Sequence, residues 1–249
     1  MRSIVSLVQS DAAVAPALWE HLTVFTIGYL IYLFSDRSAL VSRLAGLISR
    51  DGTDEARQEW VVYLQRLLGF LLLGVLPFIL TLPRRSVVAL GLSLPRGENV
   101  ILWSVIPVVI VVAVMVFRAR KNIRLDFYPQ VRRKEWNSRR ILLNALFWSI
   151  YLIGYEFAFR GYIFFPLIEE VGLTAAIAIN ASVYALAHIY KGPGEAFGAF
   201  ALGITFCMIA FATGSFVIPT VVHVILAIGN DMAAVAENPE MYFRTGRSG

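Results

Sequence analysis

The sequence predicts an all-α, polytopic membrane helix bundle with about seven transmembrane helices and one short interfacial helix. Of its 249 residues, 58% are hydrophobic, whereas soluble domains are about 45–50% apolar. The apolar residues form blocks of about 20, which is the helix length that crosses a bilayer core. Strands are not expected, because a segment inside a bilayer must satisfy its backbone groups within its own helix.

The predicted membrane spans are separated by polar connections. They cover residues 15–34, 60–82, 100–117, 141–168, 173–190, 196–213 and 216–236. Arg66 lies near one end of the second span, where its guanidinium is expected to extend to the membrane surface. Residues 39–49 have the composition of a short amphipathic helix that lies at the interface.

The distribution of basic residues predicts the orientation of the chain. Residues 118–140 carry nine Lys or Arg, and such loops stay on the cytoplasmic side. With seven spans the N-terminus then lies outside and the C-terminus in the cytoplasm, as expected of an integral protein of a bacterial inner (plasma) membrane. We interpret this loop as a topology anchor, and the net charge of +5 as membrane-related, so no nucleic acid partner is expected.

The chain divides into three regions. Residues 1–140 form an N-terminal transmembrane region, residues 141–236 a core, and residues 237–249 a short polar tail. Cys207 is the only cysteine, which excludes an intrachain disulfide and a Cys-rich zinc cluster. The first 21 residues lack an uninterrupted apolar stretch and do not have the pattern of a signal peptide.

Four ionisable side chains lie deep within the core spans: Glu156, Arg160, His188 and His223. A charged group at this depth costs about 2.5–3.5 kcal/mol on insertion scales, so each is a candidate functional residue. Glu156 and Arg160 are four positions apart, so they share a helix face and can form an ion pair. The alternative is that this ion pair only holds helices together.

Further polar residues accompany the two histidines. Asn180, Tyr184 and His188 recur every four positions and form one stripe, which is expected to face the bundle interior. Asn230 lies seven positions after His223, on the same helix face. A single histidine in such a place is more often a hydrogen-bonded packing residue than a catalytic one, so this reading stays open.

Two chemistries are open for these side chains. Glu156, His188 and His223 could hold a zinc ion with water in the open position. Alternatively, the acid could act as a base on water, with an imidazole as its partner. The chain has no HExxH motif, so a zincin-type helix is absent.

Three short motifs carry a family resemblance. They are EFAFRG at 156–161, YALAH at 184–188 and TGSFVIPTVVH at 213–223. Together they resemble the CPBP family of intramembrane proteases, which includes the CAAX-prenyl endopeptidase of Ras-converting type and bacteriocin-immunity-like bacterial relatives. The resemblance covers residues 141–235. It implies an all-helical core with a polar intramembrane cavity, and hydrolysis of a membrane-associated peptide or protein substrate, prenylated in the best-known case.

The resemblance also assigns residues. Glu156 and Arg160 match the second acid and the arginine of the family motif, and His188 and His223 match its two histidines. Tyr155 occupies the position of the first family acid, and Ala227 that of a family Asn or Asp. A phenol is a poor base at neutral pH, although Tyr155 could donate a hydrogen bond to an oxyanion. Asn230 could replace the missing polar group.

We therefore carry three hypotheses. The first is an intramembrane endopeptidase of metallo- or glutamic type, with Glu156, Arg160, His188 and His223 in its catalytic site. The second is a non-catalytic family member, such as a scaffold or an immunity protein, favoured by the two departures from the motif. The third is a transporter in which the acid and the histidines relay protons. No internal repeat supports the third hypothesis.

Overall fold

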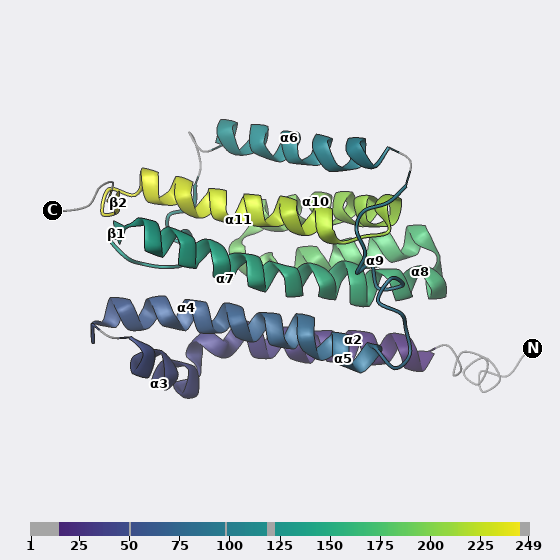
Figure 1. Ribbon diagram of the computed structural model, residues 1–249, viewed down its shortest axis with the longest axis horizontal. Helices are drawn as coiled ribbons and strands as arrows, with labels where there is room; N and C mark the ends of the chain where they lie inside the picture. Colours follow the sequence, from purple (N-terminus) through teal and green to yellow (C-terminus); the bar gives the residue numbers. More distant parts are fainter. Residues whose placement is uncertain (1–14, 50, 98, 119–122, 245–249) are drawn as a thin grey trace, which may run out of the picture.

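The computed structural model describes residues 15–49, 51–97, 99–118 and 123–244, and its helices form one bundle (Figure 1). The helices are α2 (Ala15–Phe34), α3 (Ala39–Ile48), α4 (Asp54–Phe70), α5 (Leu76–Thr81), α6 (Val100–Arg118), α7 (Ser138–Glu156), α8 (Phe165–Val171), α9 (Leu173–Leu186), α10 (Pro193–Thr213) and α11 (Val217–Glu237). The π-helical segments η2 (Leu71–Val75) and η3 (Phe157–Phe164) join α4 to α5 and α7 to α8. Two 3-10 turns are η1 (Ser35–Arg37) and η4 (Ile189–Lys191). The predictions about a signal peptide and about the end of the tail fall largely on residues 1–14 and 245–249, which lie outside the described residues.

An all-α membrane helix bundle is confirmed, and each predicted apolar segment is helical over most of its described length. Among the described residues, four helices are long and apolar enough to cross a membrane: Asp54–Thr81, Ser138–Val171, Pro193–Thr213 and Val217–Glu237. A fifth is possible if Trp19–Arg37 and Ala39–Ile48, which meet at 59°, form one span. Leu173–Leu186 is apolar but shorter. The count of seven is therefore not confirmed.

The predicted interfacial helix exists as α3. Its Val41 and Ala45 side chains are buried, and α3 packs against α4. Leu44 and Leu47 of the same helix are exposed. An exposed apolar stripe of this kind suits contact with the membrane interface, although the depth of α3 in a bilayer stays a prediction.

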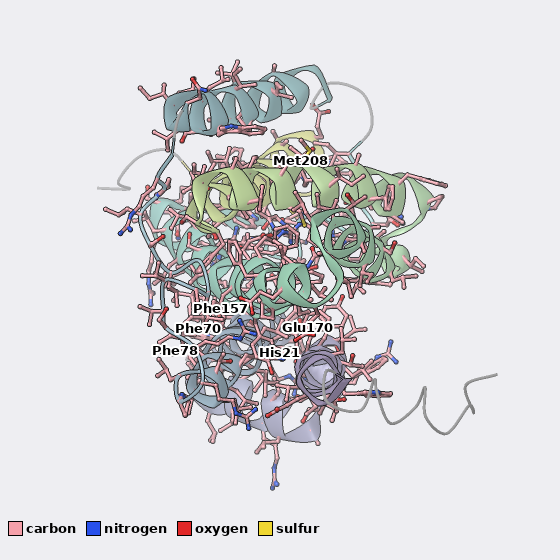
Figure 2. The ribbon with its side chains drawn as sticks, turned by 90° about the vertical axis from the view of Figure 1, so that its right-hand side faces the viewer. His21, Phe70, Phe78, Phe157, Glu170 and Met208 are labelled. Atoms are coloured by element: carbon pink, nitrogen blue, oxygen red, sulfur yellow. The ribbon has the colours of Figure 1, made fainter. Side chains whose placement is uncertain are left out.

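α7 lies at the centre of the bundle. It packs against α4 on one side and against α11 on the other, and α6 covers α10 and α11 (Figure 1). Glycines allow the closest approach, because a Cβ atom on Gly74 would lie 2.9 Å from the Cα atom of Gly154. Nearby, the rings of Phe78 and Phe157 lie 6.0 Å apart in the core between α5 and η3 (Figure 2).

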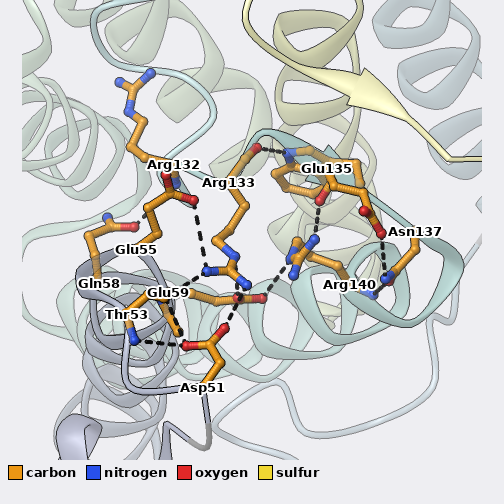
Figure 3. A network of polar contacts seen from close by, with 12 residues as sticks. Asp51, Thr53, Glu55, Gln58, Glu59, Arg132, Arg133, Glu135, Asn137 and Arg140 are labelled. Carbon is orange, nitrogen blue, oxygen red and sulfur yellow. Dashed lines mark hydrogen bonds and ion pairs between the residues drawn. The ribbon is translucent and has the colours of Figure 1, made fainter.

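A charged network closes one end of the bundle. The Arg133 guanidinium lies 3.0 Å from Asp51 and 3.3 Å from Glu59, and Arg140 lies 3.0 Å from Glu59 (Figure 3). Hydrogen bonds from Thr53 and from Arg133 hold the pKa of Asp51 below its ordinary value. Arg133 and Arg140 of the basic connection thus form ion pairs within the fold, in addition to contributing positive charge at the membrane surface.

The connections alternate between the two ends of the bundle. At the opposite end, Arg85 forms an ion pair with Glu169 at 2.8 Å, and the Ser93 hydroxyl donates to the carbonyl of Gly214 at 3.1 Å. This grouping places connections 83–99 and 169–172 together, away from residues 51–59 and 124–140. The grouping agrees with the predicted alternation, while the side of the membrane on which each end lies stays a prediction.

Two short strands correct the expectation that the chain has none. β1 (Glu135–Trp136) and β2 (Tyr242–Phe243) pair in parallel, with Glu135 opposite Tyr242 and Trp136 opposite Phe243. Both lie outside the apolar helices. In a bilayer core, a segment must satisfy its backbone groups internally, and this excludes isolated strands. Outside the core that constraint does not apply, so these two strands can form.

The expectation that Arg66 extends to the membrane surface is wrong. Its side chain is 1% exposed and lies 3.6 Å from Asp231 of α11. Its guanidinium also donates to the Asn144 side chain at 2.7 Å and lies 3.9 Å from the centre of the Trp148 ring. The buried Asp231 carboxylate pairs with Arg66 inside the bundle. If Arg66 extended to the membrane surface, that carboxylate would be buried without its partner, so the arginine points inward.

Candidate functional site

Glu156 and Arg160 are the buried charges of the central helix. α7 ends at Glu156, and the chain continues as the π-helical segment η3, which carries Arg160. Both side chains are 0% exposed, and Arg160 Nη1 lies 3.1 Å from Glu156 Oε2. This contact is an ion pair by distance only, since among the described residues neither group has hydrogen-bond geometry there. The guanidinium also lies 4.3 Å from the centre of the Tyr184 ring, a favourable cation–π distance.

His223 joins α11 to the same carboxylate. Its Nδ1 lies 2.6 Å from Glu156 Oε1, a short distance typical of a charge-assisted hydrogen bond. A carboxylate accepts, so Nδ1 carries a proton and donates, and in the neutral ring the lone pair is then on Nε2. The Tyr184 hydroxyl is 3.5 Å from the same Nδ1, which is too long for a strong bond. The structure therefore places Glu156, Arg160 and His223 together, as the motif order suggested.

His188 lies just beyond the end of α9, not within the helix. The predicted span 173–190 is helical to Leu186, and the chain then turns into η4. The backbone N–H of His188 bonds to Ala185 and not to Tyr184, which leaves the Tyr184 carbonyl without its helical partner. The imidazole Nδ1 donates to that carbonyl at 2.8 Å. Because a carbonyl only accepts, the neutral His188 ring has its lone pair on Nε2.

Tyr155 forms the aromatic wall between the two imidazoles. Its ring centre lies 5.7 Å from that of His223 and 6.4 Å from that of His188, edge-on to both. The ring also packs against Phe159 at 4.8 Å and Tyr184 at 5.9 Å. Tyr155, which stands at the position of the missing family acid, is therefore part of the site. Its ring packs against neighbouring rings, and it also carries a hydroxyl.

A cavity of about 1190 Å³ lies in front of this group. Tyr155, Tyr184, His188, His223 and Asn230 line it. Ala227 lines it too, so the departure from the motif exposes a methyl group to the cavity where the family has an amide or acid. Glu156 and Arg160 lie behind the lining, where Glu156 contacts His223 and Arg160 contacts the Tyr184 ring. A membrane-associated peptide segment could enter a space of this size.

Asn180 has a supporting role. Its side chain donates to the Phe159 carbonyl at 2.7 Å and accepts from the Cys207 thiol at 3.2 Å. Phe159 lies in η3, where the wider π turn interrupts the regular i to i−4 hydrogen bonds of the α-helix, so some backbone groups bond to other partners. All three members of the predicted stripe, Asn180, Tyr184 and His188, are buried as expected, but Asn180 fixes the π segment and does not line the cavity.

The predicted zinc ligands do not fit a three-ligand metal site as they are arranged. Within the described residues, no group of three His, Cys, Asp or Glu side chains could hold a metal ion. One oxygen of Glu156 is bonded to His223 and the other faces Arg160, whereas catalytic zinc takes three protein ligands. Zinc at Glu156, His188 and His223 stays a prediction, which elemental analysis of purified wild-type protein and His188→Ala would test.

Sequence reasoning missed a second buried polar group beside the cavity. Asp231 is 0% exposed, and accepts hydrogen bonds from Trp148 Nε1 at 2.7 Å and from Asn144 Nδ2 at 3.0 Å. It also faces Arg66 of α4. The signal was present, since an arginine and an aspartate stood in two different apolar segments, but their separation of 165 positions gave no indication that they meet.

Comparison with known proteins supports the family resemblance. Residues 137–228 match the family of type II CAAX prenyl endopeptidase, Rce1-like. This segment contains every residue of the Glu156–His223 group and His188. No curated protein and no solved structure matches the chain.

Proposed function

We propose that this chain, whose residues 137–228 form an Rce1-like protease-family domain, is an intramembrane endopeptidase. It would cleave a membrane-associated peptide, prenylated or otherwise embedded in lipid, by activating water in the cavity. The family and the apolar helices support an integral membrane protein of protease type. The observation that carries the activity is the 2.6 Å contact of Glu156 Oε1 with His223 Nδ1 at the cavity wall.

In this proposal His223 is the base. Glu156 is fully buried behind the imidazole, so the direct base role that the sequence suggested for it passes to His223. The carboxylate holds the Nδ1–H tautomer, leaving Nε2 to take a proton from water, and then stabilises the imidazolium. Arg160 balances the carboxylate charge in a site that would otherwise bury an unpaired acid.

The bond changes then follow in order. The water oxygen attacks the peptide carbonyl carbon as its proton moves to His223 Nε2. The Tyr155 hydroxyl donates to the resulting oxyanion, and the lone pair on His188 Nε2 accepts the other water hydrogen as a hydrogen bond. His223 returns its proton to the leaving nitrogen as the C–N bond breaks, so one water is consumed and a carboxylic acid and an amine are formed. The acid then releases the remaining water proton to solvent and becomes a carboxylate.

Comparison of peptide ends in membranes tests this proposal. Membrane vesicles containing wild-type protein or His223→Ala at equal level are incubated, and new peptide termini are identified by mass spectrometry. We expect a set of membrane-associated peptides cut only with the wild type. Identical termini in both samples would contradict an endopeptidase that uses His223.

A second candidate function is a non-catalytic scaffold or immunity protein. It is favoured by Tyr155, whose ring packs against five other rings, and by Ala227 in the cavity wall. Under this reading His188→Ala leaves the cellular phenotype intact, whereas Gly154→Leu, which wedges α7 from η2, abolishes it. A requirement for both histidines at unchanged protein level would exclude it.

We further propose the orientation that the basic connection predicts, with the N-terminus outside and the C-terminus cytoplasmic in a bacterial inner membrane. It is supported by the grouping of residues 51–59 and 124–140 at one end. Labelling of single cysteines placed at Arg57 and Arg85 in a Cys207→Ser background would test it. Only the cysteine at position 57 should be protected in intact cells.

A further inference from the structure

A second charged group lines the cavity away from Glu156 and His223. Lys191, Arg124 and Glu195 contribute to the lining, together with His188. Lys191 is the last residue of η4 and stands three positions after His188. One turn of chain therefore links an imidazole of the proposed catalytic site to an ammonium group on the same cavity.

No carboxylate of the described residues lies within ion-pair distance of Lys191, and Glu195 attracts its ammonium only from farther away. Arg124 forms an ion pair with Asp126 and donates to the Lys191 carbonyl, so its charge is balanced nearby. Lys191 forms no ion pair among the described residues. The contact that its Nζ makes with an oxygen is with the Tyr128 hydroxyl at 3.4 Å. Burial lowers the pKa of the Lys191 ammonium, in keeping with a cation that lacks a close partner.

Aromatic rings surround the same ammonium. The centres of the Phe127, Tyr128 and Tyr190 rings lie 5.5, 5.7 and 5.9 Å from Nζ. The rings hold the side chain by cation–π contact while offering it no anion. Glu195 stands in the first turn of α10, where a carboxylate complements the positive helix end. The ammonium is thus positioned and still open to one anionic ligand.

We propose that Lys191 is a specificity-determining residue that binds the terminal carboxylate of the peptide held in the cavity. Because Lys191, His188 and His223 line the same cavity, an extended chain that ends at Lys191, at about 3.3 Å per residue, would run along the cavity toward the two imidazoles. The inference rests on the proposed function for the position of the cleaved bond. Binding of the carboxylate itself does not require cleavage.

A lipid phosphate offers the same anionic oxygens. We favour the peptide, because Lys191 lines the interior cavity together with His188 and its ammonium stands among three rings. The two sources differ in what competes for the site. A phosphate site would be filled by anionic lipid, whereas a carboxylate site would respond to the chemical state of the peptide end.

The test compares two probes that differ at one group. A fluorescent S-farnesyl tetrapeptide with a free C-terminal carboxylate and its C-terminal amide are titrated against full-length protein in phosphatidylcholine nanodiscs. We expect the wild type to bind the acid about tenfold more tightly than the amide, the usual effect of one charge-assisted hydrogen bond. Lys191→Met should bind both equally, with its affinity for the amide unchanged. Lys134→Met, which removes the same charge from an exposed position outside the cavity lining, is the matched control and should keep the preference.

Three results would overturn the inference. They are equal binding of both probes by the wild type, binding of neither probe, and a preference retained by Lys191→Met. A preference that disappears in phosphatidylglycerol nanodiscs, together with labelled phosphatidylglycerol held by the wild type but not by Lys191→Met, would assign the site to a lipid phosphate instead. Because the assay measures binding, a wild type that binds but never cleaves would contradict the proposed hydrolysis and leave the role of Lys191 supported.

Discussion

Glu156 is a buried carboxylate that is stabilised by an arginine and that orients a histidine. It lies between the Arg160 guanidinium at 3.1 Å and the His223 imidazole at 2.6 Å, and it is fully buried. The arginine offsets the cost of burying the acid, and the acid in turn fixes the histidine tautomer. Spacing of four positions was enough to predict the first contact. The second joins residues 67 positions apart, so only the family motif could suggest it.

At the same scale, Tyr155→Phe distinguishes the role of the Tyr155 hydroxyl from that of its ring, because it removes only the hydroxyl. The ring contacts with both imidazoles should persist, while the proposed donor to the oxyanion is lost. We expect kcat for peptide cleavage to fall about 100-fold with little change in KM, because the donor acts in the transition state. Tyr162→Phe, in the π segment and away from the cavity lining, is the control. An unchanged kcat would restrict Tyr155 to packing.

Among the elements, η3 departs most from what the sequence predicts. Residues 141–168 are predicted as one helical membrane span, and within it residues 157–164 are π-helical. The reason is visible in the contacts, since Asn180 captures the Phe159 carbonyl and the loop at Leu90 approaches Gly161. Such segments often accompany functional sites. Apolar periodicity cannot predict them, because they depend on partners from other helices.

Gly161→Ala tests whether this close approach is required. A Cβ atom there would lie 2.7 Å from the Leu90 carbonyl oxygen and equally close to the Phe157 ring. We expect a loss of about 1–3 kcal/mol in unfolding free energy, measured as a lower melting temperature in detergent. Gly198→Ala, in α10 with nothing within 4 Å, should be neutral or stabilising. Equal melting temperatures for the two variants would contradict the packing described.

The pair Arg66 and Asp231 connects three helices, α4, α7 and α11. Asp231→Asn should destabilise the protein by about 3–5 kcal/mol, since it leaves a buried guanidinium unpaired. The double variant Arg66→Met with Asp231→Leu should recover much of that loss, because an apolar pair has no charge to desolvate. Additive losses in thermal unfolding would show that the two side chains act independently.

For the whole molecule, the sequence predicts the class and the helical segments but not the number of spans. Each apolar block became helix because its composition leaves no other way to satisfy backbone groups in lipid. The count of seven is not confirmed, partly because tertiary contacts end some helices early. In α9 the helix stops at Leu186, and the His188 side chain then bonds to the Tyr184 carbonyl. The cavity and its basic end at Lys191 depend on how the helices meet. Hydrophobic patterning carries no information about that.

The ion-pair network of Figure 3 ties distant parts of the chain at one end. Glu59 bonds to Arg133, Arg140 and Tyr63. We expect Glu59→Gln to lower the unfolding free energy by about 1–3 kcal/mol, because the neutral amide removes the charge that Arg133 and Arg140 face and replaces one acceptor oxygen by a donor. Asp54→Asn, at an exposed residue whose one ion pair within the described part of the chain is with Arg57, is the control and should change stability little. Equal effects of the two changes would count against the network as a structural closure.

The central claim is hydrolysis of a membrane peptide by the Glu156–His223 pair, and isotope incorporation tests it most directly. Wild-type protein in nanodiscs is incubated with an S-farnesyl peptide in water enriched in ¹⁸O, and the masses of the products are measured by mass spectrometry. The account predicts one ¹⁸O atom in the new carboxylate, and rates at least about 100-fold lower for His223→Ala and Glu156→Gln. His21→Ala, which alters the histidine packed on Tyr162, should cleave at the wild-type rate. No product from the wild type, or equal rates in all four proteins, would contradict the claim.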